Sequence, residues 1–366
     1  MNNKIKLYIF HPYSKIGGAD TSISRLINNL GPEYVIDFLC LGKNNLKLNK
    51  KIKILEIKSS RTIFSFRKIR KYLIADKKNK YKKYIFLSNQ NFANITSFII
   101  LINLRWIKKI FIERNHIDEF KYNKSLKNFI IKILMKLLYK RADKIIGISK
   151  QLSLDLSKLC DCKVQTIYNP AYDKSIYKLQ KKKNPIEKYK SMNILLNVAR
   201  LEDQKDQITL LKAFKIVEKK FNLFLIIIGY GSKLYELKKY IKFNNLTNKV
   251  KIITNVSNPY NYFANSDLFV LTSRYEGFAN VLVEAAMFNL PIISTNCNSG
   301  PREILLNGKG GFLVKVGDFI SLAKKISYCI VNKKKVKKKR NNLKSSLPRF
   351  SARDNINKYE QIFQKI

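Results

Sequence analysis

Residues 266–300 read SDLFVLTSRYEGFANVLVEAAMFNLPIISTNCNSG and predict a strand, a helix and a second strand in succession. Leu268–Leu271 is a short apolar run typical of a strand buried in a parallel sheet, and residues 291–295 form another such run. Residues 279–288, between the two runs, favour helix. This order is a βαβ unit, and the turn after its first strand is where such units bind anions and nucleotides. We therefore expect an α/β fold.

Two carboxylates, Glu276 and Glu284, flank the start of the predicted helix. Glu284 lies about one turn into the helix, from where a carboxylate can reach a ribose. Gly277 has no Cβ and lets the loop approach a ligand, and the first N–H groups of the helix, near Asn280 and Val281, suit a diphosphate. Two isolated glutamates would more often be solvated surface residues. A glycosidase acid/base pair is a poor alternative, because this spacing rises ~12 Å along a helix, whereas glycosidase carboxylates lie roughly 5–9.5 Å apart.

A resemblance to a known family lies in four segments: Glu276-Gly277-Phe278-Ala279-Asn280, Glu284-Ala285, Pro291-Ile292-Ile293 and Gly300-Pro301-Arg302-Glu303-Ile304. Together they resemble the signature of the retaining family 4 glycosyltransferases. The resemblance implies a GT-B fold, in which two Rossmann-like domains with parallel sheets face each other across a cleft. It implies that Glu276 contacts the donor sugar and that Glu284 holds the ribose. It also places Gly277, Phe278, Ala279, Asn280 and Val281 in the donor-binding site.

Two cations earlier in the chain match the same family. Arg200 and Lys205 follow the apolar run of residues 193–199 and precede a predicted helix, residues 208–219. Cations at the end of a strand suit a diphosphate leaving group, since charge-assisted hydrogen bonds are about twice as strong as neutral ones. In so basic a chain two cations alone would mean little. Their match to an Arg and a Lys of the family implies a catalytic role.

Two further segments are expected beside the nucleotide. Gly229 and Gly231 follow the apolar run of residues 223–228 and resemble a glycine loop of the family. Residues 255–257, with Val256 at their centre, are expected to line the base pocket.

The first half of the chain offers Gly17, Gly18 and His116. The two glycines follow the first predicted strand, residues 4–10, and a glycine pair is usually only a turn. The family carries Gly-Gly-Ala here, which implies a place near the donor diphosphate and the acceptor. His116 follows the predicted strand of residues 109–113, at the sheet edge where open α/β sheets bind ligands. A single histidine is more often structural. Several relatives of the family hold a histidine against the donor sugar, so we expect a catalytic role for His116. The exact alignment of His116 with that histidine stays open.

The length of 366 residues suits two domains. We expect an N-terminal Rossmann-like acceptor-binding domain at residues 1–172, a polar linker at 173–192 and a Rossmann-like nucleotide-sugar-binding domain at 193–350. Residues 351–366 are expected to form a helix that returns to the first domain. Closure of the cleft by motion about the linker is a further expectation.

The formal net charge is +47, from 72 Lys and Arg against 25 Asp and Glu. Nucleic-acid binding is the obvious interpretation. The lysines are spread along the whole chain together with many Asn and Ile, so we expect no nucleic-acid partner. An anionic membrane surface is preferred, since such a surface attracts each nearby Lys or Arg by ~1 kcal/mol.

Residues 126–141 predict a helix that could meet such a membrane. Its apolar residues recur at helical spacing and are expected to face the core. Lys132, Lys136 and Lys140 form a separate basic stripe, which would rest on the membrane together with an exposed Ile131 or Met135. Residues 333–340 are a second basic run, which we expect to be solvated, with contact to acidic lipid headgroups as the alternative.

Five unclustered cysteines and two histidines favour neither a disulfide framework nor a zinc site. The N-terminus enters a predicted strand directly, without a signal-peptide core. The longest apolar stretch, residues 98–104, falls far short of the ~20 residues of a spanning helix. We expect a cytoplasmic protein, peripheral at the inner face of the cytoplasmic membrane.

The resemblance predicts a retaining, metal-independent glycosyltransferase without a cofactor, in which the departing phosphate helps to deprotonate the acceptor. It would move a hexose or N-acetylhexosamine from a UDP-linked donor to a glycan or lipid-linked acceptor in bacterial surface polysaccharide biosynthesis. Two alternatives are a nucleic-acid-binding protein, which leaves Glu276 and Glu284 unexplained, and a family member that binds a nucleotide-sugar without turnover. The presence of Arg200 and Lys205 beside both glutamates argues against the latter.

Overall fold

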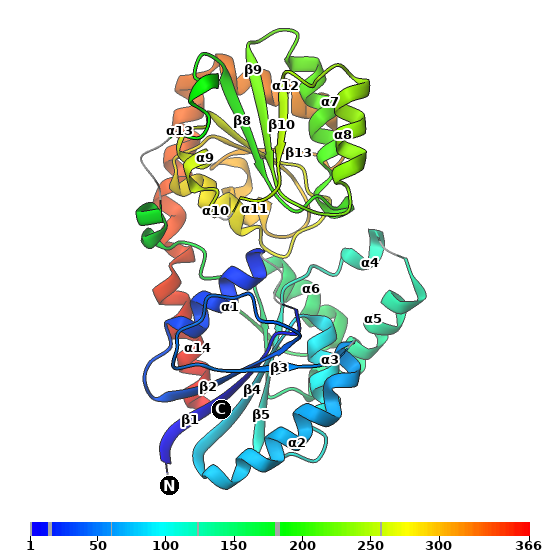
Figure 1. Ribbon diagram of the computed structural model, residues 1–366, viewed down its shortest axis with the longest axis vertical. Coiled ribbons are helices and arrows are strands. Elements are labelled where there is room, and N and C mark those ends of the chain that lie inside the picture. The colour runs from blue at the N-terminus through cyan, green and yellow to red at the C-terminus, as the bar shows by residue number, and fades with distance from the viewer. Residues whose placement is uncertain (1, 14–16, 60, 123, 180–183, 257) are drawn as a thin grey trace. The chain divides into compact units, whose positions relative to one another are not determined.

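A computed structural model describes residues 2–13, 17–59, 61–122, 124–179, 184–256 and 258–366. The chain divides into two compact units, Met1–Pro170 with Ala352–Ile366, and Ala171–Ser351. Each unit is a parallel sheet covered by helices on both faces (Figure 1). The structure therefore confirms the predicted α/β class and the two Rossmann-like units.

The first unit is built on a seven-stranded sheet in the order β3-β2-β1-β4-β5-β6-β7. Apolar strand residues such as Tyr8, Phe10 and Phe86 are fully buried and pack against α2 and α3. Its strands are β1 (Asn2–Phe10), β2 (Tyr34–Leu41), β3 (Lys53–Ile57), β4 (Tyr81–Asn89), β5 (Ile107–Glu113), β6 (Lys144–Gly147) and β7 (Val164–Thr166). Its helices are α1 (Gly18–Asn28), α2 (Phe66–Asp76), α3 (Asn91–Ile100), α4 (Glu119–Tyr122), α5 (Leu126–Leu138), α6 (Lys150–Cys160) and α14 (Ala352–Lys365).

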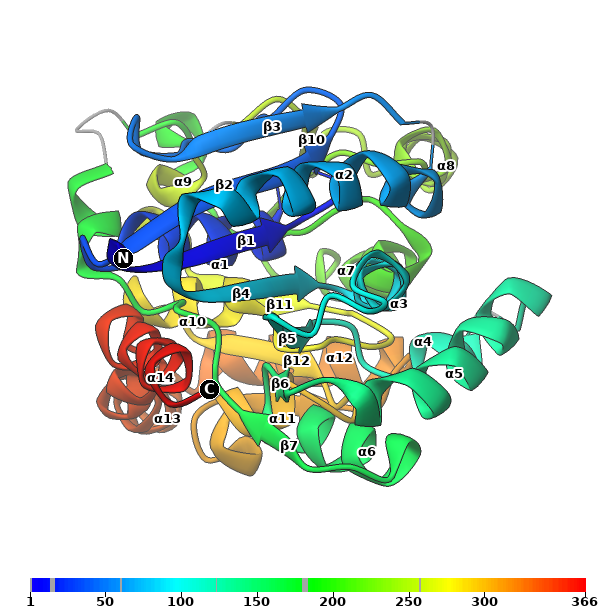
Figure 2. The same ribbon diagram turned by 90° about the horizontal axis from the view of Figure 1, so that it is seen from below.

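The C-terminal helix α14 belongs to this first unit, where it lies beside α1 (Figure 2). The Phe363 ring packs on Tyr34 with centroids 5.8 Å apart, and Gln364 donates to the Tyr34 hydroxyl at 3.2 Å. Lys83 of β4 donates to the carbonyl of Gln364 at 2.8 Å. These contacts join the end of the chain to the sheet that its beginning forms.

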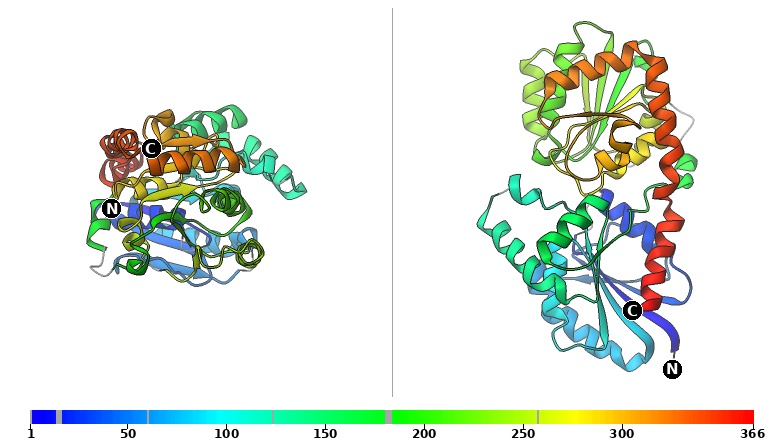
Figure 3. Two further views of the ribbon diagram at one scale, coloured as in Figure 1. Left: turned by 90° about the horizontal axis from the view of Figure 1, so that it is seen from above. Right: turned by 180° about the vertical axis from the view of Figure 1, so that it is seen from behind.

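The second unit has a six-stranded parallel sheet in the order β10-β9-β8-β11-β12-β13. Its core lies between the sheet and α7, α8 and α12, which bury residues such as Phe214, Leu237 and Ile326 (Figure 3). The strands are β8 (Asn193–Val198), β9 (Leu223–Ile228), β10 (Val250–Ile253), β11 (Leu268–Leu271), β12 (Ile292–Thr295) and β13 (Phe312–Val314). The helices are α7 (Gln207–Val217), α8 (Leu234–Phe243), α9 (Tyr260–Ala264), α10 (Asn280–Met287), α11 (Pro301–Ile304), α12 (Phe319–Val331) and α13 (Lys333–Ser346).

The segment expected as a linker, residues 173–192, lies within the second unit. Ile176 and Ile186 are buried, and the Tyr189 ring stacks on Phe224 at 3.7 Å between centroids. The Tyr177 hydroxyl donates to the carbonyl of Met287 at 2.7 Å. These few apolar and aromatic residues attach a segment whose composition is otherwise polar. Its Lys181-Lys182-Lys183 run lies outside the described residues.

The expected orientation of residues 126–141 is wrong. Ile131 and Met135, which we expected to be exposed, are buried in a cluster with Phe111 and Leu156. Phe129 and Leu137, among the residues expected to face the core, are 63% and 53% exposed. The helix buries only a narrow side against the rest of the unit. Most of its apolar side chains therefore remain exposed.

In the part of the chain that the structure describes, no helix has both the length and the apolar character needed to cross a membrane.

Candidate functional site

The candidate site of the second unit lies where its chain order reverses. β8 and β11 are neighbours, and from them the chain proceeds to β9 on one side and to β12 on the other. Such a switch point leaves space beyond the carboxyl ends of the two strands, which is where open α/β sheets bind ligands. Residues 199–205 follow β8 and residues 272–279 follow β11, so the sheet brings Arg200, Lys205 and Glu276 to one edge.

Lys205 and Glu276 form an ion pair across this switch point. The Lys205 ammonium lies 2.5 Å from Glu276 Oε1, and the two side chains are only 14% and 7% exposed. Ser273 Oγ donates to the same carboxylate oxygen at 2.6 Å, and Thr272 Oγ1 donates to the Lys205 carbonyl at 2.9 Å. Separating the two side chains would leave each charge in a poorly solvated place without its counter-ion. This cost favours the paired arrangement of Lys205 and Glu276.

Arg200 lies on the same edge and is exposed. Its guanidinium donates to Gln204 Oε1 at 3.1 Å, and Gln204 Nε2 donates to the Tyr275 carbonyl at 2.9 Å. The amide of Gln204 therefore connects the loop after β8 to the loop after β11. The edge presents an exposed guanidinium and a partly buried ammonium, which suits an anion.

The loop before α10 has a constrained backbone. Ala279 adopts a left-handed conformation with φ 73°, after which α10 starts at Asn280, and Ser299 Oγ donates to the Gly277 carbonyl at 2.8 Å. Phe278 is 1% exposed and its ring packs on Phe350 at 5.1 Å, so only its backbone can face a ligand.

The helix that follows places its N-terminus and a carboxylate at the same loop. Val281 lies in the first turn of α10, where backbone N–H groups favour anions, and the half-buried Glu284 follows one turn later.

Gly229 and Gly231 allow the loops after β8 and β9 to pass closely. A Cβ at Gly229 would lie 1.8 Å from the Ala199 carbonyl oxygen, and one at Gly231 would lie 2.3 Å from that of Leu201. These glycines are therefore required by loop packing at the site's edge. Val256 is half-buried in the segment after β10, and Ser257 lies outside the described residues.

The first unit contains the other predicted residues. Gly17 precedes α1 in an extended conformation, and its carbonyl accepts from the N–H of Thr21 at 3.0 Å, while Gly18 begins the helix. His116 is 2% exposed, and both its ring nitrogens are engaged within this unit. Its Nε2 lies 2.9 Å from Asp155 Oδ2, and its Nδ1 accepts from the N–H of Asp118 at 3.1 Å.

A buried polar network that no sequence motif marks lies at the switch point of the first sheet, where β1 and β4 are neighbours. His11, directly after β1, lies 2.8 Å from Asp20 Oδ1 through Nε2 and 2.6 Å from Asn89 Nδ2 through Nδ1. Arg114 donates to Asn89 Oδ1, and to Asn169 Oδ1 at 2.8 Å. Burial lowers the pKa of the Arg114 guanidinium. The only available signal was the position of His11, Asn89 and Arg114 at strand ends.

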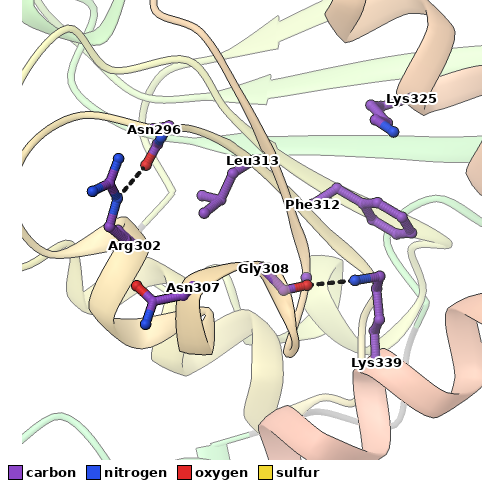
Figure 4. Close-up of a pocket in the computed structure, with 9 residues that line it drawn as sticks. Asn296, Arg302, Asn307, Gly308, Phe312, Leu313, Lys325 and Lys339 are labelled. Carbon is purple, nitrogen blue, oxygen red and sulfur yellow. Dashed lines mark hydrogen bonds between the residues drawn. The ribbon is translucent and has the colours of Figure 1, made fainter.

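A cavity of about 610 Å³ lies elsewhere in the second unit (Figure 4). Lys325 and Lys339 lie near the Phe312 ring, Lys339 donates to the Gly308 carbonyl, and Arg302 donates to Asn296 Oδ1 at 2.9 Å. None of the predicted site residues lines it. Among the described residues, no group of three or more His, Cys, Asp or Glu is placed to hold a metal ion.

Comparisons with known proteins bear on this site. The family model of glycosyl transferases group 1 matches residues 179–346. An uncharacterised glycosyltransferase of Methanocaldococcus jannaschii is 34% identical over 254 residues, which are 64% of this chain and 61% of the relative. A Campylobacter jejuni protein, N-acetylgalactosamine-N,N'-diacetylbacillosaminyl-diphospho-undecaprenol 4-alpha-N-acetylgalactosaminyltransferase, is 29% identical over 229 residues, which are 62% of this chain and 61% of the relative. The chain thus spans less than two thirds of both relatives.

The fold is also found in solved structures. An Anabaena protein crystallised in complex with UDP-glucose has a TM-score of 0.81 and 18% identity, and the match covers 99% of this chain and 100% of that one. The chain therefore has the two Rossmann-like units of the GT-B fold, and its residues 179–346 match the family model of glycosyl transferases group 1.

Proposed function

We propose that the protein is a retaining glycosyltransferase of the family 4 type. It moves a hexose or N-acetylhexosamine from a UDP-sugar to a glycan or lipid-linked acceptor in bacterial polysaccharide assembly. The observation that carries the proposal is the partly buried Lys205–Glu276 ion pair at the switch point of a sheet whose sequence matches the family model of glycosyl transferases group 1. The UDP-glucose complex of the Anabaena protein and the diphospho-undecaprenol in the name of the Campylobacter relative support the donor and acceptor classes.

The proposed roles follow from the chemistry of each side chain. Arg200 and Lys205 neutralise charge on the diphosphate as its bond to the sugar breaks. Glu276 contacts the sugar, and Glu284 accepts hydrogen bonds from the ribose. The departing phosphate oxygen takes the proton of the attacking acceptor hydroxyl, so no protein carboxylate needs to form a covalent intermediate. Lys205 would then exchange part of its contact with Glu276 for the phosphate.

We also propose that no metal ion takes part and that the acceptor is met at the anionic inner face of the cytoplasmic membrane. The net charge of +47 supports the second point, since it draws the protein to acidic headgroups. Turnover in excess chelator should equal turnover without it, and loss of activity that added metal restores would contradict the metal-free mechanism.

The decisive experiment measures release of the nucleoside diphosphate from a panel of nucleotide-sugars. At least one UDP-sugar should be hydrolysed or transferred, and Glu276→Gln should lower that rate by about a hundredfold or more. The amide keeps the shape of the side chain while removing its charge. Glu218→Gln, at the C-terminal end of α7, is the matched control and should retain full activity. No release from any donor, or equal rates in the two variants, would refute the proposal.

A further inference from the structure

The helix α5 carries an apolar face that the first unit leaves uncovered. Leu126 is 75% exposed, Phe129 63%, Leu137 53%, Ile130 47% and Ile133 43%. Their spacing of three or four residues places them on one side of a helix. A soluble surface rarely leaves so many large apolar side chains together unless they meet a partner.

Cations flank this apolar side. Lys127 lies on one border of it, and Lys132 and Lys136 lie on the other, as the helical repeat places them. Residues 124–141 contain six cationic residues and no acidic one. The Lys127 ammonium lies 4.6 Å from the centre of the Phe92 ring. The uncovered side of α5 is therefore an apolar strip with positive borders. The helix itself extends away from the sheet of the first unit (Figure 2).

A hollow of about 270 Å³ adjoins the strip, between α4 and α5. Phe120 and Phe129 supply part of its apolar wall, while Lys121, Lys124 and Lys132 also line it. Lys121 is 2.6 Å from Asp118 Oδ1, so part of its charge is compensated. Within the described residues no ion pair engages Lys124 or Lys132. The hollow thus combines apolar surface with cations, as a phosphate with an attached hydrocarbon chain requires.

We propose that this α4–α5 face, residues 120–137, docks on a bilayer of anionic phospholipid. The apolar strip enters the boundary between headgroups and chains, and the flanking lysines contact lipid phosphates. A second copy of the chain is a poor occupant, because two molecules of net charge +47 repel each other and each strip has positive borders. The docked bilayer is the anionic membrane of the proposed function. Only the biological role of the docking rests on that function.

The rival surface is α13, whose sequence is richer in lysine. Its apolar residues, Val336 and Leu343, are both buried. It can attract an anionic surface but has nothing to insert, whereas α5 can do both. This difference separates specific docking from diffuse attraction.

Co-sedimentation with phosphatidylcholine vesicles, with and without phosphatidylglycerol, tests the apolar strip. The protein should bind the anionic vesicles, and the triple variant Leu126→Ser, Phe129→Ser, Ile133→Ser should bind at least tenfold more weakly. The matched control is Tyr235→Ser, Phe243→Ser, Val331→Ser, which removes apolar side chains that are 79%, 86% and 67% exposed in the second unit. It should bind like the unaltered protein. Equal binding by both triple variants would overturn the inference.

A second pair of variants tests the cations. Lys124→Gln, Lys132→Gln, Lys136→Gln should weaken vesicle binding by about fivefold per charge, since each cation near an anionic surface contributes ~1 kcal/mol. Lys334→Gln, Lys337→Gln, Lys338→Gln on α13 removes the same charge and should have a smaller effect. Equal losses would show diffuse attraction and contradict docking by α5. A dimer in sedimentation that the Leu126, Phe129 and Ile133 changes dissociate would likewise contradict it.

Release of UDP in lipid-free solution separates this inference from the proposed function. The Leu126→Ser, Phe129→Ser, Ile133→Ser variant should release UDP at the normal rate while failing to bind vesicles. Normal release with unaltered vesicle binding in this variant would refute docking alone. Vesicle binding that depends on α5, in a protein that releases no UDP, would refute the proposed function alone.

Discussion

Glu113, the last residue of β5, is a carboxyl group enclosed by protein and only 1% exposed. Tyr139 donates to it at 2.8 Å, and the N–H groups of Arg114 and Asn115 donate at 3.0 and 3.2 Å. Burial raises the pKa of this carboxyl to about 7, although these hydrogen bonds favour the charged form. Ionisation of Glu113 therefore opposes folding of the first unit.

The sign of the pH dependence follows from this shift. Between the ordinary pKa of 4.5 and about 7, the folded chain keeps a proton that the unfolded chain has released. This group therefore lowers the free energy of unfolding as pH rises through that window, by roughly 3 kcal/mol in total. In Glu113→Gln this loss is absent, so the stability difference between variant and unaltered protein should grow with pH. Urea unfolding at each pH measures it, with the exposed Glu33→Gln as control. Parallel pH profiles of Glu113→Gln and the unaltered protein would contradict the prediction.

Single site residues could be named from the sequence only where a motif singled them out. Glu276 and Lys205 were named in this way, and the structure places them together. Their ion pair was not predictable, because 71 residues separate them and only the neighbouring positions of β8 and β11 join them. His11 carries no motif. Its contacts with Asp20 and Asn89 depend on strand order, which spacing along the chain does not reveal.

At the scale of elements, Gly300 determines how the segment after β12 packs on the loop of the candidate site. Its φ is +77°, and a Cβ there would lie 2.3 Å from the Phe278 carbonyl oxygen. Gly317 has φ +78° and nothing within 4 Å of its would-be Cβ. Both glycines have a left-handed backbone conformation that disfavours any side chain. Only at Gly300 would an added Cβ also collide with the backbone of Phe278.

Gly300→Ala should therefore destabilise the second unit more than Gly317→Ala does. For Gly317→Ala we expect a loss of roughly 1–2 kcal/mol from backbone strain. For Gly300→Ala we expect about 2 kcal/mol more, since the backbone of Phe278 must move to relieve the collision. UDP-sugar turnover should fall in Gly300→Ala alone, because the displaced loop bears Glu276. Urea unfolding and the UDP-release assay measure the two effects, and equal behaviour of the variants would show that the loop moves freely.

Helices and strands could be predicted largely from apolar patterns, but their orientation could not. The pattern of residues 126–141 shows that one side of a helix is apolar, and it does not show which side meets the sheet. The structure buries Ile131 and Met135 because they meet α3 and α6, two helices that were not predicted from the sequence. The strand β11 was predicted to the residue, and β9 coincides with the apolar run of residues 223–228, because each is a continuous buried run whose two sides are both covered.

At the scale of the whole molecule, unit boundaries followed composition only in part. Residues 173–192 are polar and rich in lysine, yet Ile176, Ile186 and Tyr189 attach them to the second unit. A few anchoring side chains outweigh average composition, since each buried apolar side chain contributes ~1.5–3 kcal/mol. Composition alone gives each residue equal weight and cannot identify such anchors.

Because of the net charge, we expect added salt to stabilise the fold and to weaken binding to anionic vesicles. Subtracting the 25 acidic residues from the 72 cationic ones leaves an excess of 47 positive charges that the acidic residues of the chain do not balance. Their mutual repulsion opposes the compact state, and its range falls from ~30 Å at about 0.01 M salt to ~8 Å at about 0.15 M. Added sodium chloride should therefore raise the midpoint of thermal unfolding, by roughly 2–4 °C per kcal/mol of relieved repulsion in units of this size.

The same screening should weaken attachment to anionic vesicles, because that attraction depends on the same cations. Thermal unfolding followed by circular dichroism and vesicle co-sedimentation across one salt series measure the two responses. A second monovalent salt, potassium fluoride, controls for specific binding of chloride. Salt that lowered the unfolding midpoint would show that ion pairs, rather than repulsion among unpaired lysines, dominate the electrostatic free energy of the fold. An unfolding midpoint that rises with salt, together with vesicle binding that falls, would establish two points. The excess positive charge destabilises the fold, and the same charge attracts the protein to an anionic surface.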